Sequence, residues 1–256
     1  MKSIVQVISE AISLLAVVLS LSCPNSFASE SWHTYIKSGD TNLEKGKLDD
    51  AEKNYLDALA DIETHGGVET AYTLNRLSTI HRQQKRWQEA LDEAQRALII
   101  WNQKKGGASL ESARTMTDIA EASLNLGLPA DTENYLRQAL VIVCRPKHTA
   151  TLASQFQGRN QYVNNLINDP STIPGSPDAV RVLTGWVNYY ISGNHFADAE
   201  ALQKRSIQML DQSAGYNNAL IFSPESEFIP WGGIPNLAGA KNKLAEIYHL
   251  QGRDQD

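Results

Sequence analysis

Cysteine is scarce in this chain, which has two such residues among 256. Cys23 lies in the apolar amino-terminal segment, and Cys144 follows the apolar run 139–143. If the amino-terminal segment is removed, no intramolecular disulfide can form, so the protein has to fold by packing alone. A thiol beside an apolar run is typically a small buried hydrophobe, and we expect Cys144 to be inert.

The sequence also lacks a cluster of lysine and arginine. It contains 23 basic and 29 acidic residues, which gives a formal net charge of −6. Because phosphate backbones are bound by concentrated positive charge, nucleic acid is not an expected partner. Hydrophobic residues make up 42% of the chain, which is enough to bury a continuous core and argues against disorder.

Motifs for catalysis or metal binding are missing as well. The chain has no Gly-rich loop followed by Lys-Ser/Thr, no His-Glu-x-x-His sequence and no cysteine pair at metal-ligand spacing. Its six histidines are spread singly, and its carboxylates lie beside lysine and arginine, as in residues 49–53. The sequence therefore predicts a protein that is not an enzyme, with no catalytic residue, no metal and no cofactor.

Residues 1–28 have the three-part form of a secretory signal peptide. Lys2 stands near the amino end, a run rich in leucine and valine covers 11–21, and the segment ends in Ser-Phe-Ala at 26–28. We expect cleavage after Ala28 and a periplasmic or secreted protein.

Two alternatives to a cleaved signal stay open. Residues 4–22 could cross a thin bilayer as a retained anchor, although polar residues weaken this interpretation. Cys23 closes the apolar run and could carry a lipid, although the residues before it fit a lipoprotein signal poorly. We expect contact with a membrane only in these two cases.

A helix–turn–helix pattern recurs along the rest of the chain. Its clearest copy is 39–59, where small residues recur at a spacing that lets two antiparallel helices approach closely. The positions that carry it are Gly39, Gly46, Leu48, Ala51, Tyr55 and Ala58. The same frame appears at 74–98, 116–140 and 182–210, and its first half appears at 238–256.

Two stretches do not follow the pattern. Residues 149–168 look helical but lack the small residues, so they form either a decayed repeat or an inserted helix, before a Pro/Ser/Gly-rich linker at 169–178. Residues 215–235 form a long connection with four aromatic side chains, Tyr216, Phe222, Phe228 and Trp231. These aromatics either pack back over the helices or contact a partner, because long connections are often functional.

The repeated residues resemble the tetratricopeptide repeat family, and the helix at 198–210 is similar to kinesin-light-chain-like repeats. The resemblance implies an all-α fold, a right-handed α-solenoid of antiparallel helix pairs with one irregular helix and one long loop insertion. We expect the signal peptide at 1–28, repeats one to three at 29–145, the irregular helix and linker at 146–178, and repeat four, the long loop and a capping helix at 179–256.

Three positions depart from the family pattern. Asn42 stands where an aromatic or leucine is usual, Thr132 replaces an alanine, and Gln203 replaces a large apolar residue. These changes affect individual helix contacts and not the expected fold.

The resemblance also implies a concave groove, lined by the first helices, that binds an extended peptide or a helix of another protein. By position, the groove candidates are Tyr72, Asn75, Thr79, Arg82, Arg114, Thr117, Glu121, Asn125, Arg181, Thr184 and Asn188. Each could instead belong to a solvated face of an amphipathic helix. Ile36 and Asp40 stand where some family members carry a carboxylate clamp, so an acidic carboxyl-terminal tail is not the expected ligand.

Taken together, these patterns predict a non-catalytic protein-interaction scaffold or assembly factor of the bacterial periplasm or envelope. The alternative is an envelope enzyme whose site lies between the irregular helix and the 215–235 loop. Glu225 and Glu227 are the acidic residues available there, and two carboxylates alone do not make a mechanism.

Overall fold

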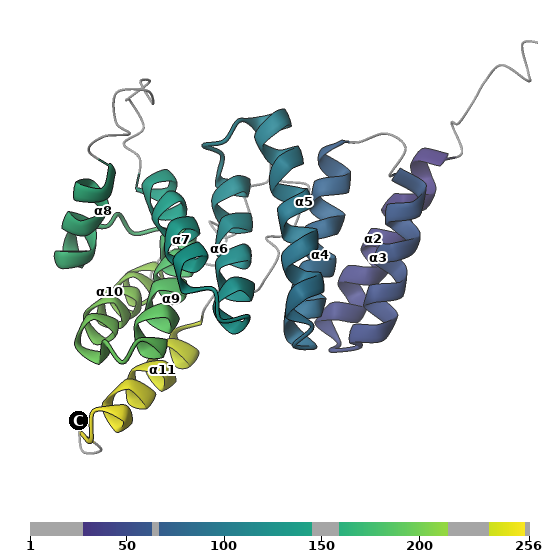
Figure 1. Cartoon of the computed structure of the whole chain (residues 1–256). Coiled ribbons are helices and arrows are strands. Elements are labelled where there is room, and N and C mark those ends of the chain that lie inside the picture. The colour runs from purple at the N-terminus through teal and green to yellow at the C-terminus, as the bar shows by residue number, and fades with distance from the viewer. Residues whose placement is uncertain (1–27, 63–66, 145–158, 215–235, 254–256) are drawn as a thin grey trace, which may run out of the picture. The chain divides into compact units, whose positions relative to one another are not determined.

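A computed structural model describes residues 28–62, 67–144, 159–214 and 236–253 of the chain (Figure 1). All regular elements in these ranges are helices, and they pack in successive pairs. The predicted all-α solenoid of helix pairs is thus confirmed. The chain divides into two compact units, residues 1–64 and 65–256.

The first unit contains α2 (Ala28–Glu44) and α3 (Leu48–Ile62). The second contains α4 (Val68–Gln83), α5 (Trp87–Lys105), α6 (Leu110–Asn125), α7 (Pro129–Val143), α8 (Arg159–Asn168), the 3-10 helix η2 (Pro170–Thr172), α9 (Pro177–Ser192), α10 (Phe196–Ala214) and α11 (Leu237–Leu250). In the described ranges, none of these helices combines the length and the hydropathy needed to cross a bilayer.

Close approach of α2 and α3 depends on a small residue facing a large one. A Cβ atom at Gly39 would lie 2.7 Å from the ring of Tyr55, so no larger residue fits without a shift of that ring. Tyr55 is fully buried, and its hydroxyl donates a hydrogen bond to Asp40 at 2.6 Å. The small-and-large pairing expected from the sequence therefore holds the first helix pair together.

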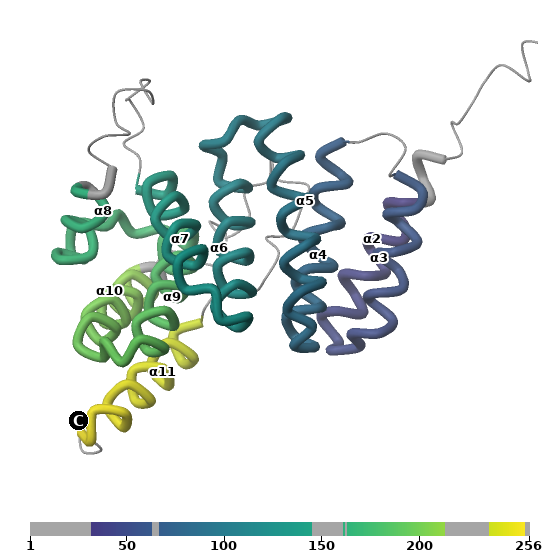
Figure 2. The backbone as a smooth tube through the Cα atoms, viewed as in Figure 1, coloured from purple at the N-terminus to yellow at the C-terminus, as the bar shows by residue number. Residues whose placement is uncertain are grey.

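The second unit repeats the same arrangement. The pairs α4/α5, α6/α7 and α9/α10 each pack tightly, and α11 packs against α10 (Figures 1 and 2). The second helix of each described pair in the chain buries a small residue at one equivalent position. These residues are Ala51, Ala90, Thr132 and Ala199.

Thr132 and Gln203, which depart from the family pattern, are both buried and hydrogen-bonded. The hydroxyl of Thr132 donates to the carbonyl of Leu128 at 2.9 Å. The side-chain amide of Gln203 donates to the carbonyl of Ala240 at 2.7 Å, which ties α10 to α11. Burying a polar group costs little when it is paired, so Thr132 fits the core. Gln203 is paired through its amide nitrogen, while its buried Oε1 atom has no partner in the described ranges.

Five turns share one geometry. Shortly after the helix that precedes each turn, one residue has a left-handed φ of 60–75°, at Gly46, Lys85, Gly127, Asn194 and Gly252. In each turn its N–H donates to the carbonyl three residues earlier, and the next N–H donates to the carbonyl five residues before itself. This double hydrogen bond ends the helix and redirects the chain.

Residues 159–168 form an inserted helix and not a member of the stack. Helix α9 packs directly against both α6 and α7, whereas α8 lies beside α7 and η2 (Figure 2). The approach of α9 is close, because a Cβ atom at Gly185 would lie 2.6 Å from Leu136. The stack therefore continues across the interruption in the repeat pattern.

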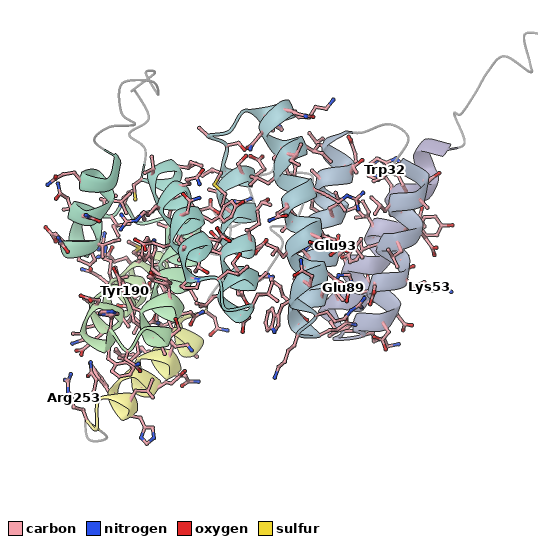
Figure 3. All side chains as sticks on the ribbon, in the orientation of Figure 1. Trp32, Lys53, Glu89, Glu93, Tyr190 and Arg253 are labelled. Atoms are coloured by element: carbon pink, nitrogen blue, oxygen red, sulfur yellow. The ribbon has the colours of Figure 1, made fainter. Side chains whose placement is uncertain are left out.

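Helix α11 occupies the place of a further first helix at the end of the second unit. It buries Ala240 and Ile247 against its neighbours. Arg253 follows the helix (Figure 3). It pairs with Glu200 of α10 at 2.8 Å and lies over the ring of Tyr248.

Candidate partner-binding site

A hollow of about 580 Å³ lies between the first helices of three successive pairs, α4, α6 and α9. We call it the groove. Eight of the eleven residues expected to line a groove line this one: Thr79, Arg82, Thr117, Glu121, Asn125, Arg181, Thr184 and Asn188. The register of the repeats therefore brings together side chains from positions 79 to 188.

The other three expected residues do not line the groove. Tyr72 is buried, and its hydroxyl accepts hydrogen bonds from Arg76. Asn75 is fully buried, and its amide nitrogen donates to Thr115 of α6 at 3.1 Å. Arg114 binds Asp178 of α9, with its Nε atom 2.6 Å from Oδ1. Asn75 and Arg114 thus link first helices of neighbouring pairs, and a contact of any of the three with a partner stays a prediction.

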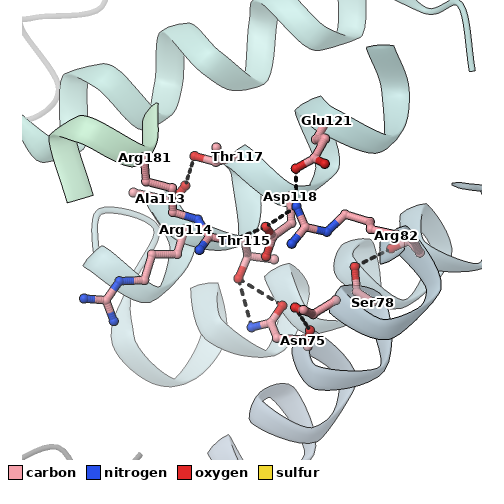
Figure 4. Close-up of polar contacts among 12 residues, drawn as sticks. Asn75, Ser78, Arg82, Ala113, Arg114, Thr115, Thr117, Asp118, Glu121 and Arg181 are labelled. Carbon is pink, nitrogen blue, oxygen red and sulfur yellow. Dashed lines mark hydrogen bonds and ion pairs between the residues drawn. The ribbon is translucent and has the colours of Figure 1, made fainter. Parts of the chain in front are cut away.

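Two arginines from different helices meet one buried carboxylate at the groove (Figure 4). The side chain of Asp118 in α6 has no exposed surface. Nη1 of Arg82 lies 3.1 Å from its Oδ1 atom, and Nη2 of Arg181 donates to the same oxygen. The side chains of both arginines are about nine-tenths buried. A buried carboxylate is tolerable here because it is paired on two sides.

Glu121 completes the charged cluster from a more exposed position. Its carboxylate accepts a hydrogen bond from Nη1 of Arg82, while 41% of its side chain stays exposed. Burial lowers the pKa of Arg82, but Asp118 and Glu121 together outweigh that effect and raise the pKa above its ordinary value. Arg82 is therefore held in its charged form by two acidic side chains of α6.

The remaining polar groups differ in what they can still bind. The hydroxyls of Thr79, Thr117 and Thr184 each donate to the carbonyl four residues earlier, at 2.9 to 3.0 Å. Their lone pairs remain as acceptors. The amides of Gln83 and Asn188 make no hydrogen bond to any described residue, so they retain both donors and an acceptor.

Six residues at the site were not among the candidates taken from the sequence: Gln83, Trp87, Asp118, Ala120, Leu124 and Gly185. Gln83 and Leu124 could have been found by applying the register consistently. Gln83 stands seven residues before the buried small residue of its second helix, as the candidate Asn125 does. Leu124 shares its register with Arg82 in the same way. Asp118 had no such signal, because its position in the other repeats carries no carboxylate.

Several expectations fall outside the described residues. They are the signal peptide up to residue 27, lipid attachment at Cys23, and the aromatic loop with Tyr216, Phe222, Phe228 and Trp231. The alternative enzyme site also depends on residues of that loop. Each of these stays a prediction.

Two observations in the described ranges concern metal binding and thiol chemistry. No three His, Cys, Asp or Glu side chains there are grouped so that they could hold a metal ion. Cys144 is buried, and burial raises the pKa of its thiol to about 12. The thiol thus stays protonated at neutral pH, as expected of a packing residue.

A family model of the tetratricopeptide repeat matches residues 32–98 and 69–145. Among solved structures, BtubC (BKLC) from P. vanneervenii, a kinesin light chain-like tetratricopeptide repeat protein, matches with a TM-score of 0.53. The match has 14% sequence identity and covers 90% of this chain and 87% of that chain, so it shows the fold alone. The sequence matches no curated protein.

Residues 32–145 of this chain therefore carry tetratricopeptide repeats. Such repeats generally mediate protein–protein interaction, and members of the family are typically non-catalytic scaffolds.

Proposed function

We propose that this protein is a non-catalytic scaffold that binds an extended segment of another protein in the groove between α4, α6 and α9. One observation carries the proposal: side chains of three successive first helices converge on a single hollow of about 580 Å³. Such a concave surface, which combines polar side chains with an apolar lining, suits a peptide, whose main chain needs hydrogen bonds along its length.

The site of action that we propose is the bacterial periplasm or envelope. The support is the sequence of residues 1–28, with its basic start, apolar run and small residues before the expected cleavage position. Measuring the mass of the protein isolated from cells tests this directly. A chain beginning at Ser29 agrees with a cleaved signal, a lipid-shifted mass at Cys23 shows an anchored form, and an uncleaved chain contradicts export by this route.

The function is tested by crosslinking the full chain in envelope extract and identifying what it retains. The groove variant carries Gln83→Ala, Asn125→Ala and Asn188→Ala, which remove amides from the groove lining. The matched control carries Gln95→Ala, Asn134→Ala and Gln212→Ala, three exposed amides on second helices.

We expect a protein that is retained by the native chain and by the control but lost by the groove variant. Equal melting temperatures of the three proteins establish that the loss is not a folding defect. A partner that the groove variant retains as well would show that another surface binds it, and the 215–235 loop would be the next to test.

A further inference from the structure

The charged groups of the groove are already balanced among themselves. Arg82 is paired with Asp118 and Glu121, and Arg181 is paired with Asp118. These four side chains carry two positive and two negative charges. A partner with an acidic or basic side chain at this point therefore finds no charge of opposite sign left to neutralise.

Entry of a charged group would also disturb the buried pairs. The side chain of Asp118 has no exposed surface, so it depends on both arginines for compensation. A ligand carboxylate that drew Arg82 or Arg181 away would leave a buried charge with less compensation, which is strongly unfavourable. A ligand without charge leaves these pairs intact.

Uncharged groups, in contrast, find suitable partners on the groove wall. Gln83 in α4 and Asn188 in α9 offer amide donors and acceptors that no described residue uses. The hydroxyls of Thr117 and Thr184 offer acceptors, because their protons are donated within their own helices. These groups match the alternating N–H and C=O groups of an extended main chain.

Glu121 has a particular place in this balance. The three innermost side chains, Arg82, Arg181 and Asp118, carry one positive charge in excess. Glu121 removes the excess, and it does so from a side chain that is 41% exposed. It is thus the one member of the cluster that can be changed without breaking the pairing of Asp118.

From these contacts we infer that the groove selects a partner segment without net charge, held through its main-chain amides, and that Glu121 is the residue that excludes acidic segments. The inference rests on the proposed function. Specificity then comes from exclusion, because the carboxylate of Glu121 occupies the cation, Arg82, that an acidic competitor would need.

The test is selection of a random library of displayed 12-residue peptides on the immobilised full chain. Selections are run in parallel on the native chain, on Glu121→Gln and on Glu133→Gln. Glu133 is the matched control, because it pairs with Arg137 at 2.6 Å, has a similarly exposed side chain and lies outside the groove lining. Both variants lose one negative charge from the same chain.

We expect the native chain and Glu133→Gln to enrich peptides of net charge near zero. On Glu121→Gln we expect enriched peptides with additional Asp or Glu. An acidic derivative of the best neutral peptide should bind this variant on the order of tenfold more tightly than the native chain, as a charge-assisted hydrogen bond to Arg82 would give.

Enrichment of acidic or basic peptides by the native chain would overturn the inference, as would identical peptide sets for all three proteins. The groove variant with Gln83, Asn125 and Asn188 changed to Ala separates this failure from failure of the proposed function. If neutral peptides bind that variant as well as the native chain, or if no peptide is enriched at all, the groove is not the binding surface.

Discussion

First and second helices of the second unit use their residues in different ways. In α4, every residue from Thr70 to His81 is buried, including seven polar or charged ones. In α5, the buried residues form one stripe, in which each has another member three or four positions away: Ala90, Leu91, Ala94, Ala97, Leu98 and Trp101. A first helix has neighbours on several sides, whereas a second helix packs through one face.

This difference explains which polar residues remain available for binding. Polar side chains in the middle of the first helices, such as Asn75 and Asp118, are used to hold the next first helix. Side-chain amides nearer the end of each first helix, at Gln83, Asn125 and Asn188, reach the groove with uncommitted or partly committed donors. The middle of the first helix therefore stabilises the stack, and its end is the part suited to recognition.

The largest expected effect comes from breaking the buried charge cluster. Asp118→Asn leaves Arg82 and Arg181 without their shared carboxylate, so the free energy of unfolding should fall by about 3–5 kcal/mol. Urea denaturation followed by circular dichroism measures it. Glu133→Gln, in a half-buried pair at the surface of α7, should change the value by less than about 1 kcal/mol. Equal losses of unfolding free energy at both positions would show that charge pairs on first and second helices contribute equally to stability.

A smaller loss is expected where α9 approaches α7. Gly185→Ala places a methyl group 2.6 Å from the buried side chain of Leu136, and the resulting overpacking should cost about 1–3 kcal/mol. Thermal unfolding of the variant and of Gly175→Ala provides the comparison, because a Cβ atom at Gly175 meets nothing closer than 4.0 Å. A neutral Gly185→Ala would mean that Leu136 has room to move.

Removing the hydrogen bond between α4 and α6 should have a moderate effect. Asn75→Ala takes away a donor to Thr115 in a fully buried site, which should cost about 1–2 kcal/mol. A double-mutant cycle with Thr115→Ala measures the coupling between the two residues. Additive losses, with no coupling, would contradict a direct role of this pair in joining the helices.

The smallest effect is a gain in stability at a turn. Lys85 has a φ of 62°, a left-handed conformation that costs a residue with a side chain more than it costs glycine. Lys85→Gly should therefore stabilise the protein, by no more than about 1 kcal/mol because glycine also gains entropy when unfolded. Asn194→Gly, at the equivalent turn, should be closer to neutral because asparagine tolerates this conformation. Differential scanning calorimetry measures the melting temperatures of both variants. A lower melting temperature for Lys85→Gly than for the native chain would refute the prediction.

Much of the helix pairing could be read from local spacing. Gly39 against Tyr55, and the buried alanines at 51, 90 and 199, follow from the need for small residues where two helices cross closely. The register also located most of the groove lining, because equivalent positions of a repeat face the same way. The turn at Lys85 was less evident, since a left-handed lysine carries no compositional signal.

What the sequence by itself determined is the repeated unit: a first helix, a turn, a second helix and a small buried residue that sets their distance. Only the tertiary structure decided how these units combine across the interruption before α9. Arg181 lies 63 residues from Asp118 in the chain, yet the two are paired, because α8 lies beside the stack and α9 packs directly on α6. Helix spacing is a short-range property of the chain, whereas charge pairing between units depends on which helices become neighbours.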